Sequence, residues 1–255
     1  MNAFETFAQL HQNSTPFLIG NIWDVNSAKL FEASGYKAIA TSSQALANSF
    51  GYDDGEKLPF EILLQLAKRV VEVVQIPFSV DIEGGYSRTI EGITANISKL
   101  HDAGVVGINL EDTLPGAPRQ LQSVNEFEKI LSAVADYISQ NNLQLFLNVR
   151  TDGFLLGMPT ALNETLVRIK SYESSGANGV FVPCITSKDD IKQVVEATKL
   201  PVNVMCMPNL PDFAELGELG VKRISMGSFL FSKVYDSARQ LLKSIDEDNN
   251  FSSIL

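Results

Sequence analysis

Acidic side chains gather in this sequence at points where short apolar runs end. Asp81 and Glu83 close one such run, Glu111 follows the next, and Arg150 follows the one after that. Asp81 and Glu83 stand two residues apart, so they share one face of an extended segment. Carboxylates that lie together repel one another unless a positive charge stands between them. Three acids and an arginine at successive run ends therefore indicate one shared site.

The residue types in this cluster favour a hard metal ion. The sequence has two histidines, His11 and His101, which fall in segments expected to be helical, and we interpret both as structural. Its two cysteines, Cys184 and Cys206, lie in apolar runs outside any CxxC pair, which is typical of buried free thiols. Carboxylate and water oxygens suit Mg²⁺, with Mn²⁺ as the alternative ion.

Arg150 is well placed to hold a substrate carboxylate, because its planar guanidinium can donate two parallel hydrogen bonds. Asp112 and Asp152 have two interpretations of equal weight: a part in the site, or a helix cap or loop salt bridge. Trp23 is equally open between the lining of the site and the core. The residues alone do not decide between these alternatives.

Eight short apolar runs alternate with longer amphipathic segments and would position these side chains. Apolar runs without polar alternation are typical of strands that are buried on both faces. We predict strands at Phe17–Gly20, Ala38–Thr41, Phe78–Ile82, Gly107–Leu110, Leu145–Val149, Gly179–Val182, Val202–Met205 and Arg223–Ser225. The acids and Arg150 end the third, fourth and fifth of these runs, so they would meet at one rim of a parallel barrel.

The amphipathic segments predict the helices, several of which stop at Gly, a common C-terminal signal. They are Asn26–Ala33, Phe60–Val74, Thr89–Ala103, Val124–Gln140, Ala161–Ser175, Lys188–Thr198, Asp212–Leu219 and Phe229–Lys243. Eight such units predict an α/β fold, a single (β/α)8 TIM-type barrel over residues 1–255, with 246–255 as a loose or docked tail. The alternative, an open doubly wound sheet, lacks its Gly-rich fingerprint after the first strand, where Gly20-Asn21-Ile22-Trp23-Asp24 stands.

Composition narrows the class of partner. The chain has 255 residues, 45% of them hydrophobic, which suffices for a full core. Its formal net charge of −10 argues against nucleic acid or an anionic membrane surface as a partner, because both require basic patches. The first residues show neither a basic segment nor a long apolar stretch, so we expect no signal peptide, no transmembrane helix and a cytoplasmic location.

Taken together, these features resemble the isocitrate lyase / phosphoenolpyruvate mutase superfamily over nearly the whole chain. The resemblance rests on the order of Gly20-Asn21-Ile22-Trp23-Asp24, Thr41-Ser42-Ser43-Gln44, Gly51-Tyr52-Asp53-Asp54, Asp81-Ile82-Glu83-Gly84-Gly85-Tyr86, Glu111-Asp112 and Val149-Arg150-Thr151-Asp152. It implies a Mg²⁺-dependent carbon–carbon lyase with a small carboxylate substrate. It also implies a homo-oligomer, a dimer or a tetramer, in which the last barrel helix is often exchanged between subunits.

The resemblance also implies a role for each acid. Asp81 matches the main Mg²⁺-anchoring Asp, Glu83 stands where the family usually has Asp, and Glu111 matches the acidic partner on the next strand. Arg150 matches the substrate-binding Arg, and Asp54 matches the Asp near the reacting centre. The candidate catalytic residues are therefore Asp54, Glu111 and Arg150.

The candidate substrate-binding set is wider. Ser42, Ser43 and Gln44 match the segment that grips the substrate carboxylate, although Ser43-Gln44 replaces the usual Gly-Gly. Trp23 and Arg119 complete this set together with Arg150.

The segment after the fourth strand departs from the family. Family lyases carry Lys-Lys-Cys-Gly-His or a near variant there, and family phosphonate enzymes carry a Lys and an Asn. This chain reads Thr113-Leu114-Pro115-Gly116-Ala117-Pro118-Arg119-Gln120, without Cys, Lys or His. Arg119 is the only cation on this segment, and it could close over an anionic substrate.

The acidic cluster is present in this chain, but the acid/base residues of the family loop are missing. This combination favours a reaction that needs only the acidic cluster. Loss of a β-carboxylate from oxaloacetate or a relative is such a reaction, because CO2 leaves without a general base. We therefore predict a lyase that acts on a small α-keto or 2-hydroxy acid through an enolate, by decarboxylation or retro-aldol cleavage. Two alternatives stay open: a P–C bond enzyme of the phosphonopyruvate hydrolase or mutase type, and a non-catalytic barrel that binds a dicarboxylate.

Overall fold

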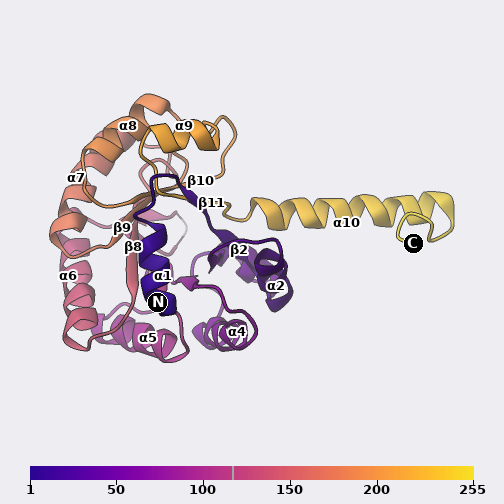
Figure 1. The fold of residues 1–255 in the computed structure, drawn as a ribbon, viewed down its shortest axis with the longest axis horizontal. Coiled ribbons are helices and arrows are strands. Elements are labelled where there is room, and N and C mark those ends of the chain that lie inside the picture. The colour runs from indigo at the N-terminus through magenta and orange to yellow at the C-terminus, as the bar shows by residue number, and fades with distance from the viewer. Residues whose placement is uncertain (117) are drawn as a thin grey trace.

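The computed structural model of the chain describes residues 1–116 and 118–255 (Figure 1). The described residues form a nine-stranded, all-parallel main sheet. Its strands are β1 (Phe17–Leu18), β2 (Gly20–Ile22), β3 (Ile39–Thr41), β4 (Phe78–Asp81), β5 (Gly107–Glu111), β8 (Phe146–Arg150), β9 (Gly179–Val182), β10 (Val202–Met205) and β11 (Arg223–Ser225).

The sheet closes on itself through a strand that is broken in two. The strand order is β1-β11-β10-β9-β8-β5-β4-β3-β2, and only Ile19 separates the two end strands along the chain. Ile19 N–H donates to Ile224 O at 3.0 Å, and Gly20 N–H donates to Ala38 O at 3.2 Å. The first predicted strand therefore pairs with the last strand by one half and with β3 by the other, which confirms the TIM-type barrel.

Helices follow the strands and surround the barrel, except the last of them, which extends away from it (Figure 1). They are α2 (Val25–Ala33), α4 (Phe60–Val73), α5 (Ile90–Asp102), α6 (Val124–Gln140), α7 (Ala161–Ser174), α8 (Lys188–Glu196), α9 (Phe213–Glu218) and α10 (Phe229–Asp248). Their starts have local causes. In α2, for example, Asp24 accepts a hydrogen bond from Ser27 N–H at 2.6 Å and caps the first turn.

Apolar side chains fill the layer between strands and helices, while polar side chains cross the barrel interior. Ile39, Val80 and Ile108 belong to the apolar layer and are fully buried. Inside the barrel, Asn148 Nδ2 donates to Oδ1 of Asn109 at 2.9 Å and to Oδ1 of Asn203 at 3.4 Å. These amides bind β5, β8 and β10 to one another beneath the rim.

A short helix, α1 (Ala3–Leu10), closes the amino-terminal end of the barrel. Phe7 on α1 is fully buried, and the ring of His11 stacks on Phe146 with centroids 4.0 Å apart. A Cβ atom on Gly107 would lie 2.7 Å from the Phe7 ring, so this position requires glycine. Arg223, at the start of β11, is also fully buried at this end, with its guanidinium carbon 5.9 Å from the centroid of the Phe7 ring.

The predicted strands and helices are all present, and the structure adds elements that the sequence did not predict. These are α3 (Ser43–Ser49) and an antiparallel hairpin of β6 (Thr113–Leu114) and β7 (Gln120–Leu121). Helix α10 continues to Asp248, so the first three residues of the expected tail are helical. Among the described residues, no helix is both long enough and apolar enough to cross a membrane.

Candidate active site

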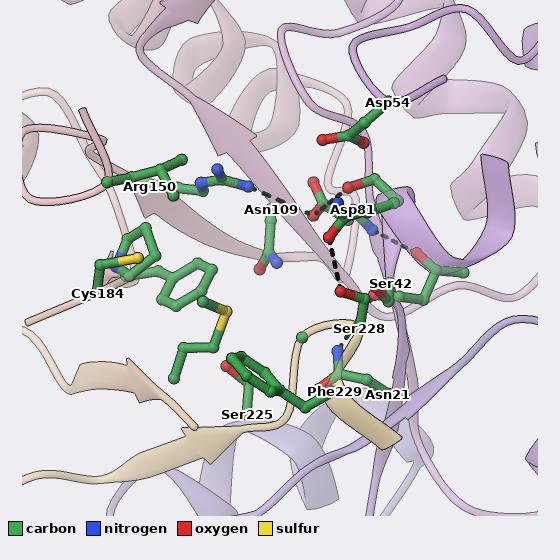
Figure 2. Close-up of a pocket in the computed structure, with 18 of the residues that line it drawn as sticks. Asn21, Ser42, Asp54, Asp81, Asn109, Arg150, Cys184, Ser225, Ser228 and Phe229 are labelled. Atoms are coloured by element: carbon green, nitrogen blue, oxygen red, sulfur yellow. Dashed lines mark hydrogen bonds and ion pairs between the residues drawn. The ribbon is translucent and has the colours of Figure 1, made fainter. Parts of the chain in front are cut away.

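A cavity of about 510 Å³ opens at the carboxyl ends of the barrel strands (Figure 2). Its described lining divides by chemistry. Charged and most polar side chains come from the segments up to β8, and apolar ones come mainly from β9, β10 and the segment after β11. The lining residues are Asn21, Thr41, Ser42, Ser43, Gln44, Asp54, Asp81, Asn109, Arg119, Arg150, Leu155, Phe181, Pro183, Cys184, Met205, Met207, Ser225, Gly227, Ser228 and Phe229.

Asp81 is held at the cavity wall by hydrogen bonds to its main chain and its carboxylate. Its N–H donates to Thr41 Oγ1 at 2.8 Å, and its carboxylate accepts from Ser43 Oγ at 3.3 Å and from Glu83 N–H at 3.1 Å. Burial raises the pKa of Asp81, and the nearby Arg150 opposes that shift. Asp81 is therefore a fixed carboxyl group that faces the cavity.

Glu83 sits in an unusual backbone conformation directly after Asp81. Its φ of 49° lies in the left-handed region, which a non-glycine residue adopts only when its surroundings hold it there. Glu56 N–H lies 3.0 Å from each carboxylate oxygen of Glu83. Burial, together with the negative charges of Asp54 and Glu111, raises the pKa of Glu83 to about 9. Glu83 consequently carries a proton at neutral pH in the metal-free protein.

Arg150 lies at the centre of the acidic group. Its Nε and Nη2 donate to the two carboxylate oxygens of Asp152 at 2.6 and 3.0 Å, and its Nη1 lies 3.0 Å from Glu111 Oε2 and 4.0 Å from Asp81 Oδ2. Burial alone would lower the pKa of Arg150, but Glu111 and Asp152 outweigh it and hold that pKa well above its usual value. The Asp152 carboxylate fixes the guanidinium plane and leaves Nη1 on the cavity side.

Glu111 is buried beside Arg150 but is incompletely hydrogen-bonded. Thr113 Oγ1 donates to Glu111 Oε1 at 2.5 Å. The contact of Oε2 with Arg150 is an ion pair without hydrogen-bond alignment, so Oε2 lacks a hydrogen-bond donor within the described part of the chain. Burial raises the pKa of Glu111 to about 7, although Arg150 pulls it down. One buried carboxylate oxygen is thus available to a further cation or donor.

Arg119 is the second cation of the site and comes from the hairpin segment between β6 and β7. Its guanidinium lies 3.1 Å from Asp152, 3.3 Å from Asp54, 3.6 Å from Glu111 and 3.9 Å from Glu83. The hairpin therefore places a positive charge between acids from four separate segments. Ala117, in the same segment, lies outside the described residues.

Asp112 points away from the cavity, and its contacts match the structural interpretation. It is fully buried and accepts hydrogen bonds from the Tyr172 hydroxyl, from Arg168 at 3.1 Å and from Asp152 N–H at 3.2 Å. Asp152 in turn binds Arg150. Asp112, Arg168 and Tyr172 thus form a support behind the arginine. No pattern in the sequence indicated this role for the two α7 residues, Arg168 and Tyr172.

The remaining predicted residues divide into cavity and core. Asp54 lines the cavity, and its Oδ1 is buried without a hydrogen-bond partner among the described residues. The predicted group at 42–44 lines it as well; Ser42 caps α3, and Gln44 Oε1 accepts from Ser228 Oγ at 2.6 Å. Trp23 is outside the lining and packs edge-on against Phe231 with centroids 5.3 Å apart. This placement favours its core interpretation.

Sequence reasoning gave no individual role to several lining residues. Asn21 and Asn109 are polar residues inside apolar runs, and that break in the pattern was an available signal. Asn21 accepts from Met226 N–H at 2.6 Å and so joins β2 to the segment after β11. Met207 and Cys184, on the apolar side, gave no such signal, because apolar residues at strand ends look like core residues.

The donor set fits a divalent cation in chemical type. Asp81, Glu83 and Glu111 supply buried oxygens, and burial raises the pKa of each, although Arg150 opposes the shift at Asp81 and Glu111. In the described ranges 1–116 and 118–255, no three His, Cys, Asp or Glu side chains are already gathered as metal ligands. Mg²⁺ commonly keeps several waters and uses one or two carboxylates, so the set suits a largely hydrated ion.

Comparisons with known proteins give a consistent family. The model of the phosphoenolpyruvate phosphomutase family matches residues 7–246. An uncharacterized protein of Mycobacterium tuberculosis (strain H37Rv) is 33% identical over 95% of this chain and 89% of its own length. Oxaloacetate decarboxylase 1 of Pseudomonas fluorescens (strain Pf0-1) is 26% identical over 92% of this chain and 83% of its own.

A solved structure gives the same fold. Phosphonopyruvate hydrolase in complex with oxalate and Mg²⁺ superposes with a TM-score of 0.87 over 100% of this chain and 90% of the other, at 20% identity.

Proposed function

The chain belongs to the phosphoenolpyruvate phosphomutase family, in the isocitrate lyase / phosphoenolpyruvate mutase superfamily of lyases and mutases, and from that premise we propose that it is a Mg²⁺-dependent carbon–carbon lyase. Its substrate is a small α-keto or 2-hydroxy carboxylic acid, and oxaloacetate decarboxylation is the reaction that we favour. Oxaloacetate decarboxylases among its relatives support this choice.

The observation that carries the proposal is the buried guanidinium of Arg150 among unneutralised acids. Arg150 Nη1 is turned toward the cavity while Asp152 occupies the other edge of the guanidinium. A substrate carboxylate bound to Nη1 would share the remaining positive charge, and the hydroxyls of Ser42 and Ser43 line the same wall. Such donors in a water-poor site bind an oxyanion strongly, because they need no reorganisation.

The proposed reaction requires little proton transfer. The C3–C4 bond of oxaloacetate breaks, CO2 departs, and the bonding electrons move to the C2 carbonyl oxygen to give the enolate of pyruvate. A bound Mg²⁺ would supply positive charge next to that oxygen. Asp81, Glu83 and Glu111 are the residues that would hold it. Asp54, which lines the cavity, would orient the departing carboxylate by repulsion, and C3 then takes up a proton from solvent water.

Arg119 serves in this proposal as the cation that closes the site. Its guanidinium already links Asp54, in the cavity lining, with the buried Asp152. One carboxylate of a bound dianion would offer it a partner of opposite charge. This role replaces the Cys, Lys or His that family loops carry on the same segment and that this chain lacks.

A P–C bond reaction is the second candidate, with Asp54 as nucleophile or electrostatic guide. The structural likeness to phosphonopyruvate hydrolase shows the fold alone at 20% identity. A barrel that binds a dicarboxylate without turnover is the third. The cytoplasmic location stays a prediction.

The test is pyruvate release, with and without Mg²⁺, from oxaloacetate, 2-methylisocitrate, isocitrate and phosphonopyruvate. We expect Mg²⁺-dependent pyruvate from oxaloacetate above the free-ion background, lost in Asp81→Asn and retained in the exposed control Asp136→Asn. Turnover of phosphonopyruvate alone would replace the proposal with the P–C reaction. Silence across the panel with saturable oxalate binding would leave the non-catalytic barrel as the function.

We also propose that the chain assembles as a dimer or tetramer through α10. None of the residues of this helix, all of them described, is buried, and it extends away from the barrel (Figure 1). Val234, Tyr235, Leu241 and Leu242 are exposed on it. An apolar stripe of this kind is stable in water when another surface covers it.

Light scattering tests this assembly. We expect a mass of two or four chains, reduced by Leu242→Glu and retained in Ser237→Glu on the same helix. A monomeric wild-type protein would refute it.

A further inference from the structure

The cavity has one side that the proposed oxaloacetate chemistry leaves unused. We define the apolar wall as Phe181, Pro183, Cys184, Met205, Met207 and Phe229, which line it from β9, β10 and the start of α10 (Figure 2). The charged residues among the described lining, Asp54, Asp81, Arg119 and Arg150, all lie on earlier segments. A four-carbon diacid has a polar group on nearly every carbon. Because it offers little apolar surface, the apolar wall would remain exposed to water when such a ligand is bound.

The apolar wall begins directly beside the proposed carboxylate site. The Arg150 guanidinium carbon lies 5.8 Å from the centroid of the Phe181 ring. A ligand held by Arg150 Nη1 therefore has Phe181 as an apolar neighbour. The two sides of the cavity consequently act on one molecule rather than on separate ligands.

The apolar wall is continuous across two strands. Cys184 Sγ lies 3.8 Å from Met207 Sδ, so side chains after β9 and β10 touch. A Cβ on Gly227 would lie 2.7 Å from Met205 Sδ, so the chain after β11 packs directly on that methionine. Methionine side chains adapt to ligand shape because they are unbranched and polarisable.

The cavity also has room beyond a four-carbon acid. Its volume of about 510 Å³ falls in the range of pockets that hold drug-sized ligands. Oxaloacetate, with nine non-hydrogen atoms, is much smaller than such ligands. With the acid groups held at the charged lining residues, the remaining space would border the apolar wall, where no described lining residue carries a charge.

Resting on the proposed function, we infer that the substrate carries a short alkyl substituent on the carbon next to its keto group, and that the apolar wall binds this substituent. The enzyme thus prefers a 3-alkyl-substituted 2-keto diacid to oxaloacetate itself. Met205 and Met207 set the accepted chain length, because both line the apolar wall and their unbranched side chains can adapt to the length of the substituent.

Binding of oxamate and its N-methyl, N-ethyl and N-propyl derivatives by calorimetry tests the inference without turnover. Each compound presents the same carboxylate and carbonyl to Arg150, while the alkyl arm grows by one carbon. We expect the affinity to rise about fourfold per added methylene, the value for burying one CH2 group. Met207→Thr should flatten this gradient, and Met158→Thr, which alters a methionine outside the cavity lining, should retain it.

The outcomes separate the inference from the proposed function. Oxamate binding with a flat or falling gradient would overturn the inference and leave the lyase proposal intact. A gradient that Met207→Thr leaves unchanged would also overturn it, because the arm would then lie elsewhere. Loss of assembly in Met207→Thr, seen by light scattering, would identify the apolar wall as a subunit interface instead. No binding of oxamate itself would refute the proposed site and the inference with it.

Discussion

The two ends of the barrel interior bury charge in opposite ways. At the carboxyl end, Arg119 and Arg150 stand among five acids, and the acids remain in excess. At the amino end, Arg223 and His11 lie among aromatic rings, and Arg223 Nε and Nη1 have no hydrogen-bond partner among the described residues. In our proposal, the first end receives a cation and an anion. The second is a packed plug of aromatic side chains.

This difference gives the two ends opposite dependences of stability on pH. Glu83 and Glu111 have raised pKa values, so the folded chain holds protons that the unfolded chain releases above their ordinary value of 4.5. Their contribution is lost as pH rises toward about 7 and 9. Burial, helped by Arg223, lowers the pKa of His11 to about 3, so its contribution is lost as pH falls below 6.5.

The largest expected effect is at the carboxyl end. Arg150→Lys removes the two parallel hydrogen bonds to Asp152, and a lysine cannot restore them. We expect kcat/KM to fall about 10³-fold, roughly 4 kcal/mol of transition-state stabilisation. Steady-state kinetics on the substrate identified by the panel measures this. The exposed control Arg69→Lys should keep full activity, and a loss below tenfold in Arg150→Lys would contradict the comparison.

The amino end should respond in stability instead. Phe7→Ala empties the middle of the plug, and we expect the free energy of unfolding to fall by about 4 kcal/mol. Denaturant titration measures it, with the exposed Phe213→Ala as the control. The KM of the folded enzyme should not change. A changed KM with unchanged stability would mean that the plug is part of the site.

A smaller effect follows from the excess acids. Glu83→Gln keeps an acceptor for Glu56 N–H and removes the group whose pKa is raised. In metal-free protein at pH 7, we expect the variant to be about 3 kcal/mol more stable than wild type, with little difference at pH 4. The exposed control Glu218→Gln should track wild type at both pH values. Equal stabilities of Glu83→Gln and wild type at pH 7 would show that the buried Glu83 carboxyl does not destabilise the fold.

The smallest expected effect is on stability at acidic pH, and it comes from His11. At pH 5 the unfolded chain binds a proton at His11 that the folded chain excludes, which costs about 2 kcal/mol relative to pH 7 and above. His11→Gln should lose this part of the slope between pH 7 and 5. Thermal or denaturant unfolding at the two pH values measures it. An identical slope in the variant would show that His11 titrates normally.

The barrel and the residues at its strand ends could be predicted because the sequence repeats one strand–helix unit. Strands and helices alternate with a regular period, so Asp81, Glu111 and Arg150 could be placed at strand ends and hence at one rim. The support of Arg150 could not, because Arg168 and Tyr172 lie 56 and 60 positions after Asp112 and meet it only in the folded barrel.

Two further features could not be predicted from the sequence, each for a local reason. The hairpin at β6 and β7 has strands of only two residues, too short for a periodic signal. The extent of the apolar wall could not be predicted, because Met207 and Cys184 are indistinguishable by type from core residues. Asn21 and Asn109 are the opposite case. They are polar residues inside apolar runs, so the sequence pattern could have indicated that they line the cavity.

Because the first strand is divided into β1 and β2, its two halves pair with their partners at different times while the chain is being synthesised. Phe17 and Leu18 pair with β11, whose last residue is Ser225, more than two hundred positions later. The emerging chain can pair β2 with β3 early, but β1 waits with an open edge until nearly the whole polypeptide has left the ribosome. Closing so long a loop is slow, and an unpaired edge invites contact with other chains. Chains that stop before residue 223 would therefore keep that edge and be prone to aggregate.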